Sequence, residues 1–265
     1  MAVIQVNFYA KSICKPTMFQ MILPNDNPFN PEETNEHFRR PMKTLVLLHG
    51  YSGNCFDWLV NSPVSDLAGK YNVAIVMPTG DNSFYLNGTS STAKYEDFIC
   101  VDLIEYLQKT FGLAKTPEDT FIGGLSMGGF GALHSGLAHP EVFGKMFGLS
   151  SALIADEVCN MKPGFGNGVA NYEYYAQTFG NPSELKEAHN NPKFVLSERV
   201  KKGEKIQPIF MACGSEDFLI APNRDFKDFL ISNGVEVTYK ESPGVHDWKF
   251  WNEYIEPAII FGISE

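Results

Sequence analysis

The sequence lacks several features that would place it in other classes of protein. Its five cysteines are an odd number without a Cys-x-x-Cys pair, so neither a disulfide framework nor a zinc site is signalled. No apolar stretch approaches the about 20 residues of a membrane span. The N-terminus has neither the charged start nor the long apolar run of a signal peptide. We therefore expect a cytoplasmic protein with reduced cysteines and no membrane partner.

Basic residues are fewer than acidic ones, with 21 lysines and arginines against 31 aspartates and glutamates. The net charge of −10 disfavours nucleic acids and anionic membranes as partners. Hydrophobic residues make up 44% of the chain and charged residues 20%, which is enough apolar material to cover both faces of a sheet. Chains of this length with α/β composition commonly fold around one core. We expect a single domain over residues 1–265.

The order of apolar runs predicts an α/β fold. Strands are expected near residues 3–10, 17–23, 44–49, 73–77, 120–124, 145–150, 207–213 and 235–240, and the clearest helices at 93–111, 129–139 and 248–263. An early pair of strands followed by strand-helix alternation predicts a mostly parallel central sheet with antiparallel N-terminal strands and helices on both faces. Residues 24–41 are expected to form a surface loop.

The most informative motif is Gly124-Leu125-Ser126-Met127-Gly128, between a predicted strand and a predicted helix. This context is typical of a nucleophile elbow, in which a serine occupies a sharp and strained turn. The glycines two residues before and after the serine remove side chains that would collide across the turn. The first N–H groups of the helix would face an oxyanion that forms at the serine. Ser126 is therefore the predicted nucleophile.

Two other interpretations of this glycine-rich turn remain open. It could cradle a phosphate, but no Gly-Lys-Ser or Gly-Lys-Thr follows, and the glycines do not have the Gly-x-Gly-x-x-Gly spacing. It could also be purely structural. A cysteine nucleophile has no elbow or base of its own in this sequence.

A serine nucleophile needs a histidine base and an acid that orients it, in the chain order serine, acid, histidine. Asp217 follows the predicted strand 207–213, and an acid beyond the carboxyl end of a parallel strand points into the ligand-binding crevice of such sheets. Glu216 is the alternative acid. His246 comes directly after the next strand, so it is the predicted base. Among the other histidines, His134 and His139 are expected to be structural, and His37 and His189 to be solvated.

The segment that begins at His49 follows a strongly apolar strand and can supply the second donor of an oxyanion hole. We predict the backbone N–H groups of Met127 and Tyr51 as the two donors, with Ser52 as the alternative to Tyr51. His49 is expected to brace the loop rather than to titrate in catalysis.

Residues 151–205 form an aromatic and glycine-bearing insert rather than a simple strand-helix unit. We expect part of it to form a wall or small cap over Ser126, with Phe165 and Tyr172 contacting substrate. The alternative is that these aromatics only pack the insert against the sheet. Trp58, near the predicted oxyanion loop, is a third candidate for substrate contact.

These motifs resemble the esterase D group of the α/β-hydrolases, and most closely its tributyrin-esterase branch. The resemblance extends over nearly the whole chain and rests on residues 47–53, 124–133, 214–219 and 243–248 and on the opening at residues 5–12. It implies the α/β-hydrolase fold, Ser126, Asp217 and His246 as the catalytic triad, and Tyr51 and Met127 as oxyanion donors. It also implies a homo-oligomer, and no metal or cofactor.

The activity that the resemblance implies is hydrolysis of short-chain carboxylic esters, including acetylated or feruloylated sugar derivatives. S-formylglutathione hydrolases, which are thioesterases, are related, but that branch usually has threonine and cysteine where Ser52 and Gly53 stand here. An acyltransferase would use the same triad. A non-enzymatic binding protein on this fold would normally have lost one of these residues.

Overall fold

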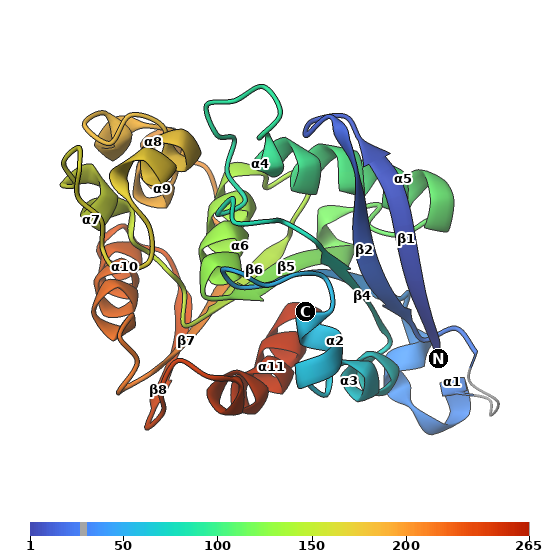
Figure 1. Ribbon diagram of the computed structural model, residues 1–265. Coiled ribbons are helices and arrows are strands. Elements are labelled where there is room, and N and C mark those ends of the chain that lie inside the picture. Colours follow the sequence, from blue (N-terminus) through green and yellow to red (C-terminus); the bar gives the residue numbers. More distant parts are fainter. Residues whose placement is uncertain (27–30, 265) are drawn as a thin grey trace.

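The computed structural model describes residues 1–26 and 31–264, and within them the strands form one eight-stranded sheet (Figure 1). The strands are β1 (Ala2–Ala10), β2 (Lys15–Leu23), β3 (Lys43–Leu48), β4 (Val73–Pro78), β5 (Thr120–Leu125), β6 (Lys145–Leu149), β7 (Ile209–Gly214) and β8 (Val237–Ser242). Their order across the sheet is β1-β2-β4-β3-β5-β6-β7-β8. All eight strands lie where the sequence predicted them, although β7 and β8 each begin two residues later than expected.

The sheet is mostly parallel, as predicted. β1 pairs antiparallel with β2, and β2 antiparallel with β4, whereas every pair from β4 to β8 is parallel. The carboxyl ends of β3, β5, β7 and β8 therefore meet at one edge, and the segments that follow these strands carry the predicted site.

Helices cover both faces of the sheet (Figure 1). On one side lie α2 (Asp57–Asn61), α3 (Val64–Tyr71) and α11 (Trp248–Ile263), and on the other α4 (Tyr95–Asp97), α5 (Leu103–Phe111) and α6 (Met127–Ala138). The insert contains α7 (Ala155–Cys159), α8 (Tyr172–Phe179), the short helix η4 (Leu185–Glu187) and α9 (Pro192–Lys201), and α10 (Ile220–Ser232) follows β7.

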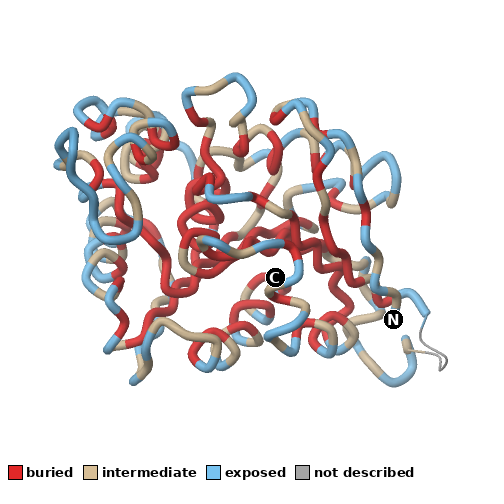
Figure 2. Tube along the Cα trace, in the orientation of Figure 1, coloured by how far each residue is buried: buried red, intermediate tan, exposed pale blue. Residues whose placement is uncertain are grey.

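Two apolar cores lie on the two faces of the sheet, and Figure 2 shows the buried chain running through the centre of the molecule. β3, β4, β5 and β7 are buried along almost their whole length, which is typical of parallel strands covered on both sides. Every residue of α6 except the last is buried, because this helix packs directly on β5 and β6.

Two expected segments differ in detail. The helix predicted over residues 93–111 consists of α4, a π-helical turn (Phe98–Asp102) and α5. In the loop predicted at 24–41, residues 27–30 lie outside the described part of the chain, and the remainder contains the short helices α1 (Pro31–Thr34) and η1 (Glu36–Arg39). Short helical turns such as η3 (Pro117–Asp119) also connect elements elsewhere.

No helix among the described residues combines the length and hydropathy needed to span a membrane.

Candidate active site

Ser126 lies in a strained turn between β5 and α6. Its backbone has φ 53° and ψ −118°, a conformation that non-glycine residues rarely adopt. The turn is held by hydrogen bonds from the Ser126 N–H to the Leu149 carbonyl (2.9 Å) and from the Phe130 N–H to the Ser126 carbonyl (3.0 Å). The strain places the serine at the N-terminus of α6, where the positive end of the helix dipole lies.

The flanking glycines are required by close backbone contacts. A Cβ on Gly124 would lie 2.5 Å from the Gly128 carbonyl carbon, and a Cβ on Gly128 would lie 2.6 Å from the His49 carbonyl oxygen. Real Cβ atoms do not approach other atoms this closely. The structure thus supplies the steric reason for the Gly-x-Ser-x-Gly spacing, and extends it, because Gly128 also makes room for the loop after β3.

The structure brings Ser126, His246 and Asp217 together from three different loops. His246 Nε2 lies 3.0 Å from Ser126 Oγ, and His246 Nδ1 lies 2.9 Å from Asp217 Oδ2 and 3.1 Å from Oδ1. The loop that carries His246 ends at Asp247, whose side chain caps α11 by accepting the Phe250 N–H at 3.0 Å. The cap fixes the direction in which the chain leaves His246.

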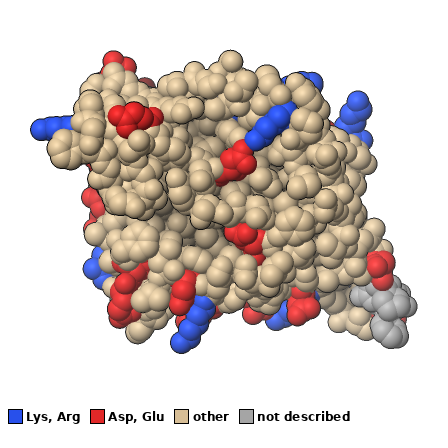
Figure 3. Space-filling model, in the orientation of Figure 1, with Lys and Arg blue, Asp and Glu red and all other residues tan. Residues whose placement is uncertain are grey.

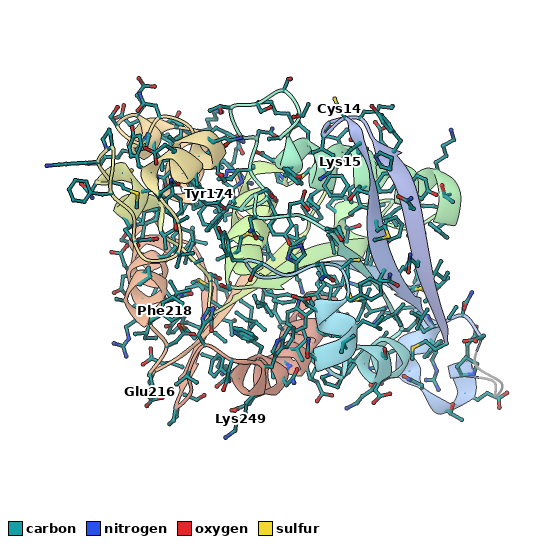
Figure 4. All side chains as sticks on the ribbon, in the orientation of Figure 1. Cys14, Lys15, Tyr174, Glu216, Phe218 and Lys249 are labelled. Atoms are coloured by element: carbon teal, nitrogen blue, oxygen red, sulfur yellow. The ribbon has the colours of Figure 1, made fainter. Side chains whose placement is uncertain are left out.

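Asp217, rather than Glu216, is the acid that contacts the histidine. The Asp217 side chain is buried, and burial by itself raises the pKa of a carboxyl group; hydrogen bonds from His246 and from the Leu219 N–H (2.8 Å) outweigh that effect and lower the pKa of Asp217 below its ordinary value. Glu216 is exposed and accepts the Gly244 N–H at 2.5 Å instead. Figure 4 labels Glu216 and Phe218, which stand on either side of Asp217 in the chain.

Two aromatic rings hold the imidazole of His246. The Phe218 ring centroid lies 4.6 Å from that of His246, and the Trp251 ring meets it edge-on at 5.0 Å. Phe218 is 71% exposed and Trp251 is buried. One side of the imidazole is thus fixed by the core and the other by a side chain at the surface.

The loop after β3 lies beside the serine. His49 is buried; its Nε2 accepts the Gly80 N–H at 2.9 Å, and its Nδ1 lies 2.7 Å from the Gly50 carbonyl. This pair of contacts requires the proton on Nδ1, so His49 is neutral, and burial lowers its pKa further. His49 therefore braces the loop, in agreement with the sequence-based prediction.

The geometry favours Tyr51 over Ser52 as the second oxyanion donor. The Ser52 N–H donates to Asn82 Oδ1 at 2.7 Å, so it is already engaged. Tyr51 lines the cavity at Ser126 together with Met127, the first residue of α6, whose N–H has no partner within its own helix.

A cavity of about 300 Å³ opens at Ser126. Its lining is mostly apolar: Gly50, Tyr51, Phe84, Leu125, Ser126, Met127, Ala152, Ile154, Asn167, Val169, Tyr175, Phe218, His246 and Trp251. Figure 3 shows a hollow in this face of the molecule, with mostly uncharged residues around it. The insert supplies part of the wall through Ile154, Val169 and Tyr175.

The three predicted substrate contacts do not line this cavity. Phe165 is 67% exposed, and its carbonyl accepts the Tyr172 N–H at 2.8 Å, so both residues belong to a turn at the outer edge of the insert. Trp58 is buried; its Nε1–H donates to the Leu48 carbonyl at 3.0 Å, and its ring packs edge-on against Trp248. Within the insert, the aromatic side chain that lines the cavity is Tyr175, one turn into α8, rather than Phe165 or Tyr172.

Two of the remaining histidines were predicted to be structural. His134 is buried within α6, and His139 follows its last residue, in agreement with that prediction. His189 was expected to be solvated; its side chain is 57% exposed, but Nε2 lies 2.7 Å from the buried carboxylate of Glu96. His37 is half-buried and packs edge-on against Tyr71 rather than being fully solvated.

Known proteins resemble this chain over its whole length. A family model described as "Putative esterase" matches residues 12–261. The chain is 40% identical over 261 residues to an acetyl esterase of Caldicellulosiruptor saccharolyticus, which covers 97% of both proteins. A substrate-bound structure of fluorophosphonate-binding serine hydrolase F of Staphylococcus aureus has a TM-score of 0.85 and 29% identity, covering 100% of this chain and 99% of that one. An S-formylglutathione hydrolase of the same organism has a TM-score of 0.82 and 29% identity, covering 99% of each chain.

Proposed function

This chain belongs to the esterase family of that model, and we propose that it hydrolyses short-chain carboxylic esters, acetyl esters above all, through an acyl-enzyme formed on Ser126. The observation that carries the proposal is the continuous chain of hydrogen bonds from Asp217 through His246 to Ser126, which ends at the wall of a small apolar cavity.

In the first half-reaction, Ser126 Oγ attacks the ester carbonyl while His246 Nε2, 3.0 Å away, takes its proton. Asp217 remains ionised, holds the imidazole with its proton on Nδ1 and stabilises the imidazolium. The imidazolium then gives its Nε2 proton to the alcohol oxygen as the ester bond breaks. The alcohol leaves, and the acyl group stays on Ser126.

The oxyanion that forms in this attack is stabilised by the N–H groups of Met127 and Tyr51. Removal of one such donor typically lowers kcat by about 10²- to 10³-fold. Both residues are held in place before substrate binds. Met127 is held by α6, and Tyr51 by the contacts of His49 and by the Ser52–Asn82 hydrogen bond. In the second half-reaction, water replaces the alcohol and the same groups act in the same order.

The cavity limits the size of the acyl group. A volume of about 300 Å³ has to hold the whole reacting part of the substrate, and its walls are mainly aromatic and aliphatic side chains. Small apolar acyl groups such as acetyl and butyryl fit this description better than long chains.

A thioester is the second candidate. The likeness to an S-formylglutathione hydrolase over 99% of the chain supports it, and the same triad serves both chemistries. Ser52 and Gly53, which depart from the pattern of that branch, weigh against it.

The proposal is tested by initial rates on p-nitrophenyl acetate, butyrate and octanoate, methyl ferulate and S-formylglutathione. We expect the highest kcat/KM with acetate or butyrate, and a loss of about 10⁴-fold or more in Ser126→Ala. Ser232→Ala, at an exposed serine of α10, serves as the matched control and should retain full activity. Preference for S-formylglutathione would move the function to the thioesterase branch, and inactivity on all five would contradict both proposals.

A further inference from the structure

A second cluster of polar side chains is formed by α4, α6 and the segment before α9. Glu96 of α4, His134 of α6 and His189, which precedes α9, each place one potential ligand atom within 4.8 Å of those of the other two. Glu96 and His134 are buried, and His189 is exposed. Glu96 and His189 are 93 residues apart in the chain, so only the fold brings the three together.

One ring nitrogen of His134 makes a hydrogen bond, and the other has no hydrogen-bond partner among the described residues. His134 Nε2 lies 2.8 Å from the backbone carbonyl of His189, a contact that requires the proton on Nε2. His134 Nδ1 therefore carries a lone pair, and this atom is buried with no hydrogen-bond partner among the described residues. A buried acceptor without a partner costs free energy, which a bound group that approaches this nitrogen would recover.

In the Glu96 carboxylate, likewise, one oxygen has hydrogen-bond partners and the other has none among the described residues. Oε1 is 2.7 Å from His189 Nε2 and 2.9 Å from His139 Nε2. Oε2 is buried and, within the part of the chain that the structure describes, has no partner. Two buried acceptor atoms thus remain in a cluster that already contains an exposed imidazole.

We propose that Glu96, His134 and His189 form a binding site for a divalent transition-metal ion, with Zn²⁺ as the best match. Two imidazoles and one carboxylate are a donor set that Zn²⁺ prefers. The ion would take the place of the Nε2 proton of His189, which now donates to Glu96 Oε1 and would be released to solvent on binding. A metal-binding histidine normally donates its second ring N–H to a carbonyl or carboxylate, and His134 does so toward the His189 carbonyl. His139, which is not one of the three proposed ligands, orients the Glu96 carboxylate in a similar way, because it contacts Glu96 Oε1.

The site has a route to solvent. His189 lines an open pocket of about 410 Å³ together with Glu141, whose Oε1 is 3.0 Å from His139 Nδ1. An ion can reach His189 from this pocket, whose lining does not include Ser126 or His246.

The role of such an ion is structural. His134 is eight residues beyond Ser126 in the same helix, roughly 12 Å at 1.5 Å per residue, so the ion would not touch the reacting ester. It would tie α4 and α6 to the segment before α9, and so anchor the insert that supplies Val169 and Tyr175 to the cavity. The inference does not depend on which ester is hydrolysed.

Zinc binding to the chelator-treated protein tests the inference. We expect one Zn²⁺ per chain by elemental analysis after gel filtration, and a rise in Tm of about 5 °C at a Zn²⁺ concentration 100-fold above Kd. His189→Ala, a change at an exposed side chain, should weaken binding by about tenfold or more. His37→Ala, the control outside the cluster, should bind as the wild type does.

The triad histidine could also attract zinc, so His246→Ala is included and should retain the bound ion. Loss of the ion in His246→Ala, unchanged affinity in His189→Ala, or absence of both bound zinc and a Tm shift in the wild type would each overturn the proposal. In those cases the three residues are only an ion-pair cluster around Glu96.

Discussion

The side-chain oxygen of Asn82 accepts the Ser52 N–H over 2.7 Å and thereby fixes the loop that carries Tyr51. Ser52 itself has a φ of 62°, a left-handed conformation that needs support from its surroundings. The backbone carbonyl of Asn82 in turn accepts the hydroxyl of Tyr174, which Figure 4 labels in α8, at 2.6 Å. The insert is thus connected to the oxyanion loop through Asn82, and Tyr174 also packs edge-on against the ring of Tyr51.

Asn82→Ala should therefore lower kcat without a comparable change in KM. We expect a loss of about tenfold, less than the 10²- to 10³-fold for removal of a donor itself, because the Tyr51 N–H is misplaced rather than absent. Steady-state kinetics on p-nitrophenyl acetate measure the effect. Asn160→Ala, at an exposed asparagine after α7, is the matched control. Equal kcat in the two variants would exclude a positioning role for Asn82.

Ile154→Ala should shift the preference toward longer acyl chains. Ile154 is almost fully buried and lines the cavity, so its truncation enlarges the space in front of Ser126. Each methylene that fits an apolar pocket contributes about 1–3 kcal/mol to specificity, so the ratio of kcat/KM for octanoate to that for acetate should rise about tenfold. Phe165→Ala should leave the ratio unchanged, since Phe165 lies outside the cavity. A rise of this ratio in Phe165→Ala but not in Ile154→Ala would instead support the expectation that Phe165 contacts the substrate.

Gly128→Ala should destabilise the fold severely. The added Cβ would clash with the His49 carbonyl at 2.6 Å, and neither backbone segment can move without breaking the elbow. We expect a loss of about 3 kcal/mol or more in the free energy of unfolding. Gly69→Ala in α3 is the contrast, because its Cβ meets only the Met1 sulfur at 4.0 Å and alanine favours the helix. Urea denaturation of the two variants compares them, and similar stabilities would contradict the steric account of the motif.

Ionised Asp217 should stabilise the fold, and this contribution to the free energy of unfolding should be lost at acid pH. Its pKa is lower in the folded protein than in the unfolded chain, so the contribution is present above the unfolded pKa of about 3.9 and is lost as pH falls through the folded value. The difference in unfolding free energy between wild type and Asp217→Asn should therefore be larger at pH 6 than at the lowest pH at which both fold. A difference that grows on acidification would show that the carboxylate is destabilised by burial.

The three residues at strand ends could be predicted from sequence because each follows a recognisable strand: β5 and β7 are buried apolar runs, and β8 alternates between half-buried and exposed residues. Ser126, Asp217 and His246 come after β5, β7 and β8, and parallel pairing makes their convergence unavoidable. The central strands were predicted as continuous apolar runs because they are buried on both faces, whereas the edge strands β1 and β8 were predicted from the alternation of their residues.

The cavity lining could not be predicted in the same way. Val169 and Tyr175 belong to an irregular insert, where no periodicity tells which side chain faces inward. Asn82 lies in a loop between β4 and α4, and its partner Ser52 is 30 residues away, so no local pattern signals their contact. The Glu96 cluster joins three segments without any short ligand spacing, so no sequence pattern indicates the proposed metal site.

Covalent labelling with a fluorophosphonate probe tests the central claim most directly, since such probes react with a serine that has been activated as a nucleophile. Intact mass spectrometry and peptide mapping would give the stoichiometry and the site. We predict one label per chain on Ser126 in the wild type, none in Ser126→Ala, and labelling slowed by at least about 10²-fold in His246→Ala. A label on another residue, or equal labelling rates in the wild type and His246→Ala, would contradict a Ser126 nucleophile activated by His246.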